Sequence, residues 1–194
     1  ILGRQSEWWD VLTAGLRMGA VVAPGTTQLS AADLKYRLNA SGAVAIVTDT
    51  ANADKVEQVA EACPALKARL VIDGPRSGWI DYAAEFAVAS DAYETADTLS
   101  QDEALCYFTS GTTGYPKMCI HTHSYPIGHR VTGKYWLDLG PDDLHWNISD
   151  TGWAKAIWSS YFGPWHCGAA IFVHHTAGFS SSRVLQLLAE HPIT

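Results

Sequence analysis

Cysteine is scarce in this chain, and its spacing excludes two common kinds of site. The four cysteines, Cys63, Cys106, Cys119 and Cys167, stand singly and form no C-x-x-C pair. Small disulfide-stabilised domains and cysteine zinc sites both depend on clustered cysteines. Single cysteines are more typical of reduced thiols in a core, and they weakly favour a reducing compartment.

Long apolar runs and an excess of basic residues are also absent. No window approaches the roughly 18 apolar residues that a membrane-spanning helix needs, and residues 1–17 lack the basic and apolar regions of a signal peptide. Lys and Arg number 13 against 20 Asp and Glu, so the formal net charge is −7, which argues against a nucleic-acid partner. We therefore expect a soluble protein of the cytoplasm, or alternatively of the mitochondrial matrix, with no membrane span.

The sequence does contain enough apolar residues for a folded core. Of the 194 residues 47% are hydrophobic, and 8 are tryptophans, most of which we expect to pack in the core. The chain begins with Ile1, not with methionine, and stops at Thr194, where a further strand is expected. We therefore expect an excerpt from a longer protein.

Predicted helices and strands alternate along the chain. Continuous apolar runs predict buried parallel strands, whereas apolar residues at helical spacing predict helices. The predicted helices are residues 7–18, 30–39, 54–62, 123–136, 154–161 and 180–191, and the predicted strands are residues 20–23, 43–48, 69–73, 104–108, 143–149 and 169–174. A polar stretch at residues 89–101 predicts a loop. The alternation indicates an α/β fold with parallel sheets and flanking helices.

One segment combines the residue types that bind phosphate groups. After the strand at 104–108 the chain reads TSGTTGYPK, which is Thr109, Ser110, Gly111, Thr112, Thr113, Gly114, Tyr115, Pro116 and Lys117. The glycines allow positive φ and let backbone N–H groups approach an anion closely. The hydroxyls add neutral donors, the proline stiffens the exit, and the lysine supplies a mobile positive charge. We therefore predict that residues 109–117 bind a triphosphate.

Other interpretations of the histidines and of this loop are weaker or fail on spacing. A Walker A loop needs glycine directly before its lysine, where this chain has Pro116, and the G-x-G-x-x-G pattern is absent. A surface turn rich in small polar residues is the remaining alternative. His121, His123, His174 and His175 have no second cluster at metal-ligand spacing. We therefore predict no metal site built from the histidines and cysteines.

Residues 109–117 resemble the phosphate loop of the adenylate-forming, or AMP-binding, superfamily. Residues 146–153 (WNISDTGW) and 18–28 (MGAVVAPGTTQ) are similar to two further segments of medium-chain acyl-CoA synthetases, and residues 7–9 (EWW) fit the same family. The resemblance covers nearly the whole chain. It implies that residues 1–194 are an incomplete part of the N-terminal AMP-binding domain.

The resemblance implies a two-step ligase reaction. The carboxylate of a medium-chain fatty or related acid attacks the α-phosphorus of ATP, pyrophosphate leaves, and coenzyme A takes the acyl group from acyl-AMP, with Mg²⁺ as the implied cofactor. Within this scheme Lys117 aids the departure of pyrophosphate, Trp153 shapes the acyl pocket, and Gln28 lies near the acyl or coenzyme A site. Packing in the core and closure of a turn are the alternative roles of Trp153 and Gln28.

The resemblance also implies that several family motifs lie beyond residue 194. These are the acidic segment that holds Mg²⁺, the aspartate that binds ribose, and a small C-terminal domain with the catalytic lysine. We therefore expect these residues alone to lack appreciable ligase activity and, with incomplete sheets, to aggregate. Two alternatives remain open: an adenylation domain for another acid or an amino acid, and a non-enzymatic nucleotide- or acyl-binding module.

Overall fold

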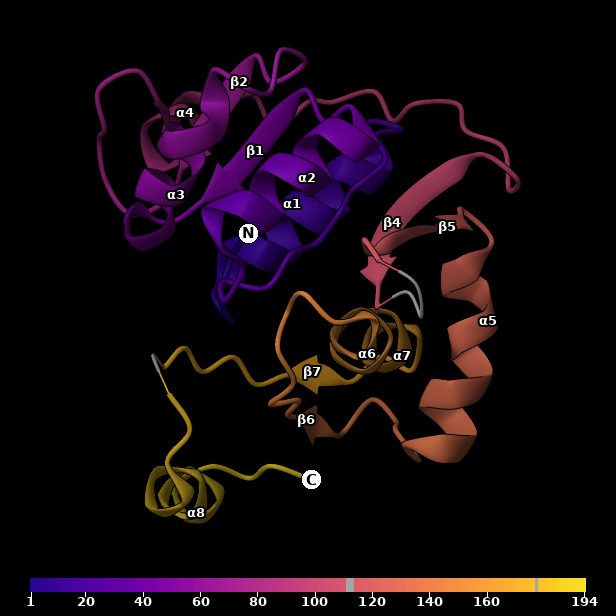
Figure 1. The fold of residues 1–194 in the computed structure, drawn as a ribbon. Helices are drawn as coiled ribbons and strands as arrows, with labels where there is room; N and C mark the ends of the chain where they lie inside the picture. The colour runs from indigo at the N-terminus through magenta and orange to yellow at the C-terminus, as the bar shows by residue number, and fades with distance from the viewer. Residues whose placement is uncertain (111–113, 177) are drawn as a thin grey trace.

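The computed structural model describes residues 1–110, 114–176 and 178–194, in which helices surround three small sheets (Figure 1). The elements are α1 (Ser6–Arg17), α2 (Ala31–Ser41), β1 (Ala45–Thr48), α3 (Thr50–Ala60), β2 (Ala68–Val71), β3 (Ile80–Asp81), α4 (Tyr82–Val88), β4 (Glu103–Thr109), β5 (Lys117–Thr122), α5 (Tyr125–Val131), the π-helical turn η1 (Thr132–Trp136), β6 (Leu144–His145), α6 (Ala154–Ile157), the π-helical turn η2 (Trp158–Phe162), α7 (Gly163–His166), β7 (Ala170–Ile171) and α8 (Ser181–Glu190). Strands β1, β2 and β3 pair in parallel, as do β6 and β7, whereas β4 and β5 are antiparallel.

The first sheet has a different helix layer on each face. Side chains alternate along a strand, so Ile46 joins the core cluster of α2 and α3, while Val47 packs against the cluster that includes α1. Val71 and Ile72 divide in the same way between the two clusters. The sheet therefore has a helix layer on each face, and the apolar run of residues 43–48, which contains β1, is typical of such a strand.

Helix α2 is fixed at both ends by local sequence. Ser30 and Asp33 form a capping box, in which the Ser30 hydroxyl accepts from the Asp33 N–H and the Asp33 carboxylate accepts from the Ser30 N–H. Gly42 ends the helix in the left-handed conformation, with φ 60°. Leu34 and Leu38, one turn apart, bury the helix against the sheet. This rigid helix contacts the predicted phosphate loop.

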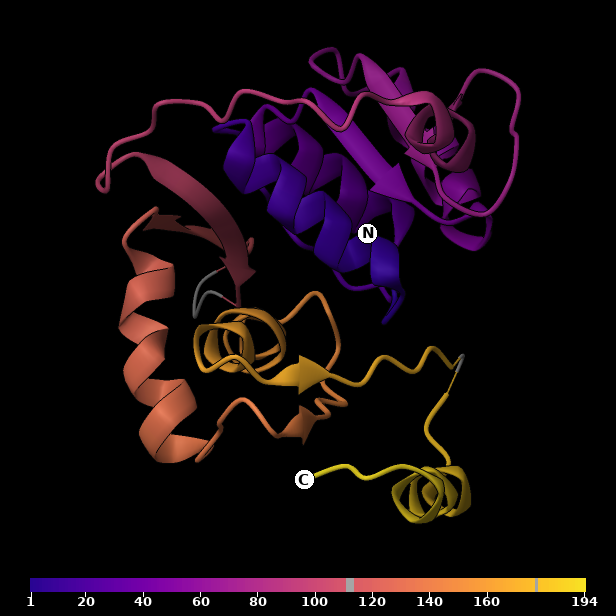
Figure 2. The same cartoon turned by 180° about the vertical axis from the view of Figure 1, so that it is seen from behind.

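The second core lies between α1, β4 and the continuous helical run of α6, η2 and α7. Trp9 of α1 is 7% exposed, and its indole N–H donates to the Ser160 carbonyl at 2.7 Å. Four consecutive residues of β4, from Ala104 to Tyr107, are buried. Val22 forms a parallel bridge to Leu105, which attaches the chain after α1 to this strand. Figure 2 shows α1 from behind, with the extended segment after α4 crossing above it.

The predicted α/β class, with parallel sheets and flanking helices, is confirmed, but several elements differ from the prediction, and β3 and α4 were not predicted. Strand β5 and its antiparallel pairing with β4 were not predicted, because residues 117–122 mix polar and apolar residues. The predicted strand 20–23 is reduced to the single bridge at Val22. The predicted strands 143–149 and 169–174 keep only two residues each, in β6 and β7, because a ladder extends only where the partner strand runs alongside.

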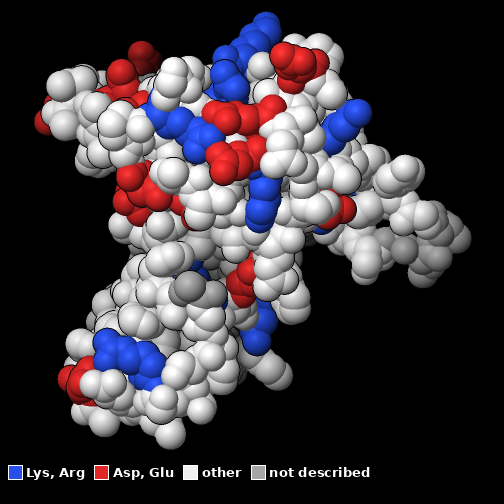
Figure 3. Space-filling view, turned by 60° about the vertical axis from the view of Figure 1, so that its left-hand side comes forward, with Lys and Arg blue, Asp and Glu red and all other residues white. Residues whose placement is uncertain are grey.

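Charged side chains of both signs are mixed on the surface. On the face in Figure 3 acidic and basic residues lie among each other, and no continuous basic band crosses that face. Arg76 donates to both carboxylate oxygens of Glu57 at 2.8 Å and also pairs with Asp54. These hydrogen bonds from Arg76, together with one from Trp79, lower the pKa of Glu57 to about 2. The exclusion of a nucleic-acid partner stays a prediction.

Candidate functional site

The hairpin of β4 and β5 presents the two ends of the predicted phosphate loop. Thr109, the last residue of β4, pairs with Lys117, the first residue of β5, and both are exposed. The Thr109 hydroxyl donates to the Lys117 carbonyl at 3.4 Å. Gly111, Thr112 and Thr113 lie outside the described residues. The antiparallel pairing therefore brings Lys117 back beside the start of its own loop.

Gly114 has the backbone conformation that the sequence predicts. Its φ is 96°, in the region that side chains rarely adopt. A Cβ at this position would meet no atom within 4 Å, so space is not what requires glycine here. The requirement is conformational, because the chain turns at Gly114 before it enters Tyr115 and Pro116.

Helix α2 contacts the loop on both sides. The Tyr36 ring stacks on the Tyr115 ring with centroids 4.7 Å apart, and the Tyr36 hydroxyl donates to the Pro116 carbonyl at 2.8 Å. On the other side, Tyr36 meets the edge of Phe108 at 6.2 Å, and the Arg37 guanidinium lies 4.9 Å from the Phe108 ring centroid. Burial lowers the pKa of Arg37, while the aromatic face attracts its charge.

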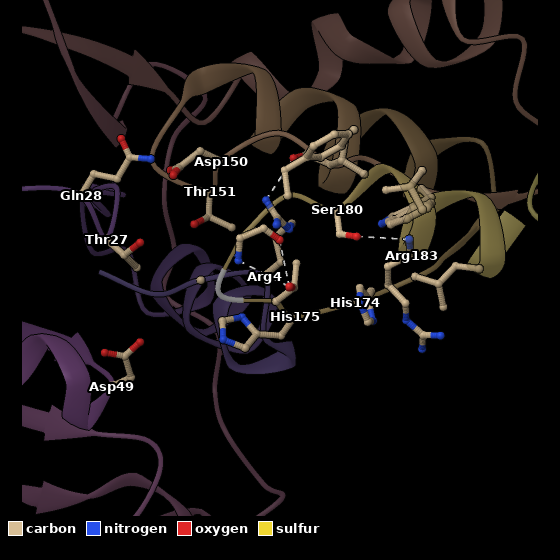
Figure 4. A pocket seen from close by; sticks show the side chains of 18 of the residues that line it. Arg4, Thr27, Gln28, Asp49, Asp150, Thr151, His174, His175, Ser180 and Arg183 are labelled. Carbon is tan, nitrogen blue, oxygen red and sulfur yellow. Dashed lines mark hydrogen bonds between the residues drawn. The ribbon is translucent and has the colours of Figure 1, made fainter.

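A second feature is a cleft of about 460 Å³ between the 24–28 loop, the segment after β7 and α8 (Figure 4). Side chains of both charges and several hydrogen-bonding groups line it, among them Arg4, Gln28, Asp49, Asp150, His175 and Arg183. The described lining residues include neither Lys117 nor Trp153. The structure therefore brings Gln28 to a cleft that the described residues of the phosphate loop do not line.

Asp150, which lines this cleft, joins the two segments that resemble acyl-CoA synthetases. The Thr26 hydroxyl donates to one Asp150 oxygen at 2.8 Å, and the Gly152 N–H donates to the other at 2.8 Å. A Cβ on Gly152 would lie 2.0 Å from the backbone nitrogen of Thr26. The glycine of the D-x-G-W segment is therefore needed because the backbone of the 24–28 loop passes directly against it.

Trp153 lies at the start of α6 with its side chain 64% exposed. It follows the Asp150–Gly152 turn, and its N–H donates to the Asp150 carbonyl at 3.1 Å. Within the described residues, this side chain is therefore not packed in a core. Its position offers a flat apolar surface next to the joined segments.

Two contributors to the site act across long sequence separations. Tyr36 reaches Pro116 across 80 residues of sequence, and Thr26 reaches Asp150 across 124. Only the fold brings these groups together. Asp150 could have been singled out because it opens the D-x-G-W segment, but nothing near Tyr36 marks it.

The histidines are distributed among aromatic contacts. His121 lies 4.1 Å from the Tyr125 ring centroid, and His129 stacks on Trp158 at 5.8 Å. The His145 Nε2–H faces the Ser159 carbonyl at 2.7 Å, and burial lowers the His145 pKa below its usual value. Across the described ranges, no group of three or more His, Cys, Asp or Glu could hold a metal ion. In those ranges, no helix combines the length and apolar character that a membrane crossing requires.

Comparisons with known proteins agree on one family. The family model described as AMP-binding enzyme matches residues 1–194. The chain is 45% identical over 196 residues to the human mitochondrial acyl-coenzyme A synthetase ACSM3 and 46% identical over 197 residues to human mitochondrial ACSM4. Both alignments cover all of this chain but only 33% and 34% of the relatives, so the chain spans about a third of their length.

Solved structures share the fold. The anthranilate CoA ligase AuaEII in complex with anthranoyl-AMP matches with a TM-score of 0.89 and 22% identity, over 96% of this chain and 36% of that chain. The Brucella canis acyl-CoA synthetase matches with a TM-score of 0.89 and 25% identity, over 100% of this chain and 35% of that chain. The arrangement of helices and sheets described above is therefore the one found in part of these larger proteins.

Proposed function

Because this chain belongs to the family of AMP-binding enzymes, we propose that the whole protein is an ATP-dependent acid–thiol ligase. It joins a medium-chain fatty acid, or a related carboxylic acid, to coenzyme A through an acyl-AMP intermediate. Relatives that are named acyl-coenzyme A synthetases support this proposal. In this scheme residues 1–194 are part of the N-terminal AMP-binding domain, and alone they lack appreciable ligase activity.

The observation that carries the proposal is the TSGTTGYPK sequence at the turn between β4 and β5. In the first step a carboxylate oxygen bonds to the α-phosphorus of ATP, and the bond from that phosphorus to the pyrophosphate oxygen breaks. Negative charge grows on the departing pyrophosphate. The hydroxyls and N–H groups of residues 109–117, with the exposed Lys117 ammonium, stabilise that charge.

In the second step the coenzyme A thiol loses its proton and attacks the acyl carbon, and the bond from that carbon to the AMP oxygen breaks. We assign the acyl or coenzyme A contacts within this chain to Gln28, which lines the cleft, and to Trp153. An exposed indole after the Asp150–Gly152 turn gives an alkyl chain a flat apolar surface. The hydrogen bonds of Thr26 and Gly152 to Asp150 hold the 24–28 loop against the Asp150–Gly152 turn.

Mg²⁺ is part of the proposed reaction, since it neutralises phosphate charge when bound with ATP. Mg²⁺ at nucleotide sites usually binds phosphates plus one or two carboxylates. Among the described residues, no group of three or more His, Cys, Asp or Glu could hold a metal ion. We assign Mg²⁺ no ligand within the described residues.

For the compartment, the cytoplasm and the mitochondrial matrix are both compatible with the proposal. The relatives named as mitochondrial support the matrix. Fractionation of cells that express the intact protein distinguishes the two compartments.

The test is acid-dependent pyrophosphate exchange by the intact protein with acids from acetate to laurate, benzoate and amino acids. We expect exchange to peak with medium-chain acids. We expect Trp153→Ala to reduce kcat/KM for those acids by about tenfold, since apolar pocket contacts give discrimination of that order. Trp136→Ala is the matched control, because Trp136 is also exposed, at 78%, but ends η1 and does not follow the Asp150–Gly152 turn.

The outcomes separate the alternatives. A peak with amino acids identifies an adenylation domain of another kind. ATP binding without exchange on any acid identifies a nucleotide-binding module and ends the ligase proposal. An equal effect of the two tryptophan substitutions removes Trp153 from the acyl pocket.

A further inference from the structure

One residue of α2 touches the chain on both sides of the phosphate loop. Tyr36 contacts Phe108, the residue just before Thr109, and also contacts Tyr115 and Pro116, just before Lys117. A side chain that touches both ends of a loop limits how far the ends can separate. The two described ends of the loop therefore contact α2 as well as each other through the β4–β5 hairpin.

The hydrogen bond of Tyr36 acts at the residue that leads into Lys117. Its acceptor is the Pro116 carbonyl, and the next residue begins β5. Because the peptide group is planar, fixing that carbonyl also fixes the orientation of the Lys117 N–H. The stack on Tyr115 holds the preceding residue, with the two rings inclined by only 17°.

The helix that carries Tyr36 is a suitable rigid support. Leu34 and Leu38 anchor α2 in the core, and the Ser30–Asp33 capping box fixes its first turn. Tyr36 itself is only half-buried, with a hollow beside it that is lined by Lys35, Asn39 and Tyr115. The core contacts of Leu34 and Leu38 therefore hold the helix in place independently of Tyr36, whose ring and hydroxyl face the loop.

We infer that Tyr36 is a positioning residue for ATP binding, which holds Tyr115, Pro116 and the start of β5 at Lys117 in place before the nucleotide arrives. The inference rests on the proposed function, because that function includes ATP binding. If only some of the molecules hold Lys117 in this position, the apparent dissociation constant for ATP rises in proportion. Saturating ATP selects those molecules, so turnover at saturating ATP stays the same.

The experiment uses the intact protein and two substitutions of Tyr36. Tyr36→Phe keeps the ring stack and removes only the hydroxyl, so we expect KM for ATP to rise about fivefold, the usual value of one hydrogen bond. Tyr36→Leu removes the stack as well, and we expect about tenfold or more. In both variants we expect kcat and KM for the acid to stay unchanged.

Tyr161→Phe is the matched control. It also removes one tyrosine hydroxyl, whose partner is the Thr13 hydroxyl at 2.9 Å in the other core. A general loss of stability lowers the Tm of both variants, but only the Tyr36 variant is expected to change ATP affinity. Calorimetric titration with ATP measures this affinity without any catalysis.

The outcomes for this inference differ from those for the ligase reaction. Weaker ATP binding by Tyr36→Phe, with Tyr161→Phe like the wild type, supports the inference even if no acid gives exchange. Equal ATP affinity of Tyr36→Phe and the wild type overturns it, as does an equal rise in KM for ATP and for the acid. An intact wild-type protein that binds no ATP overturns both the inference and the proposed function.

Discussion

Gly152→Ala tests whether the two segments at the cleft pack as closely as the structure indicates. The added methyl would lie 2.0 Å from the Thr26 nitrogen and 2.5 Å from the Gly25 carbonyl carbon. All of these neighbours are backbone atoms, so rotation of a side chain cannot relieve the contact. Gly152 does not have positive φ, and alanine therefore fits its backbone conformation. The contact itself is the source of any destabilisation.

The expected cost can be estimated in two ways. Overpacking a tight site typically costs about 1–3 kcal/mol. If the segments separate instead, the hydrogen bonds to Asp150 from Thr26 and Gly152 are weakened, at about 1 kcal/mol or more each. Together the two routes give a decrease of about 1–3 kcal/mol in the free energy of unfolding, measured by urea denaturation of the intact protein.

Gly128→Ala is the control for this prediction. Gly128 lies in α5, and a Cβ there would meet no atom within 4 Å. Both substitutions reduce the conformational freedom of the unfolded chain equally. The difference between their free energies of unfolding therefore reports the contact of the new methyl group at position 152 with the 24–28 loop. We expect Gly128→Ala to be stabilising by about 0.5–1 kcal/mol. If Gly152→Ala is as stable as Gly128→Ala, the backbone of the 24–28 loop does not lie against Gly152 as described.

Two further predictions concern the second core and its histidine. Trp9→Phe leaves the buried Ser160 carbonyl without its indole partner. We therefore expect the free energy of unfolding, measured by chemical denaturation, to fall by about 1–3 kcal/mol. An unchanged denaturation midpoint would show that this hydrogen bond adds no stability. His145 has its pKa lowered by burial, so its contribution to stability is complete above about pH 6.5. That contribution is lost as the pH falls toward the folded-state pKa, and the slope of stability against pH between 7 and 5 should be smaller in His145→Gln than in the wild type. An identical slope would contradict the assignment.

The parts of the fold that were predicted are those with a local physical cause. The capping box of Ser30 and Asp33 and the stop at Gly42 define α2 from residues that touch one another. Strand β1 was recognisable because residues 43–48 form a continuous apolar run, which is typical of burial on both faces of a sheet. In each case the residues that determine the element lie within it or next to it.

The parts that were missed depend on partners far along the chain. Strand β5 reads KMCIHT, in which polar and apolar residues mix, and its strand conformation comes from pairing with β4. Strands β6 and β7 pair with each other over only two residues, although the apolar runs around them are longer. Periodicity reports which side chains are buried, but it does not report how far a neighbouring strand extends.

The same distinction applies to the candidate site. The sequence predicts a phosphate-binding loop at residues 109–117, because glycine, hydroxyl residues and lysine each have a physical reason to lie near a phosphate group. It could not predict that Tyr36 contacts both ends of the loop, since a tyrosine in a helix is compatible with many surroundings. The loop composition provides the groups that contact phosphate, and the fold provides the support that holds them. Separate measurements of ATP affinity and turnover in Tyr36→Phe therefore test the contribution of the fold without changing any group of the loop itself.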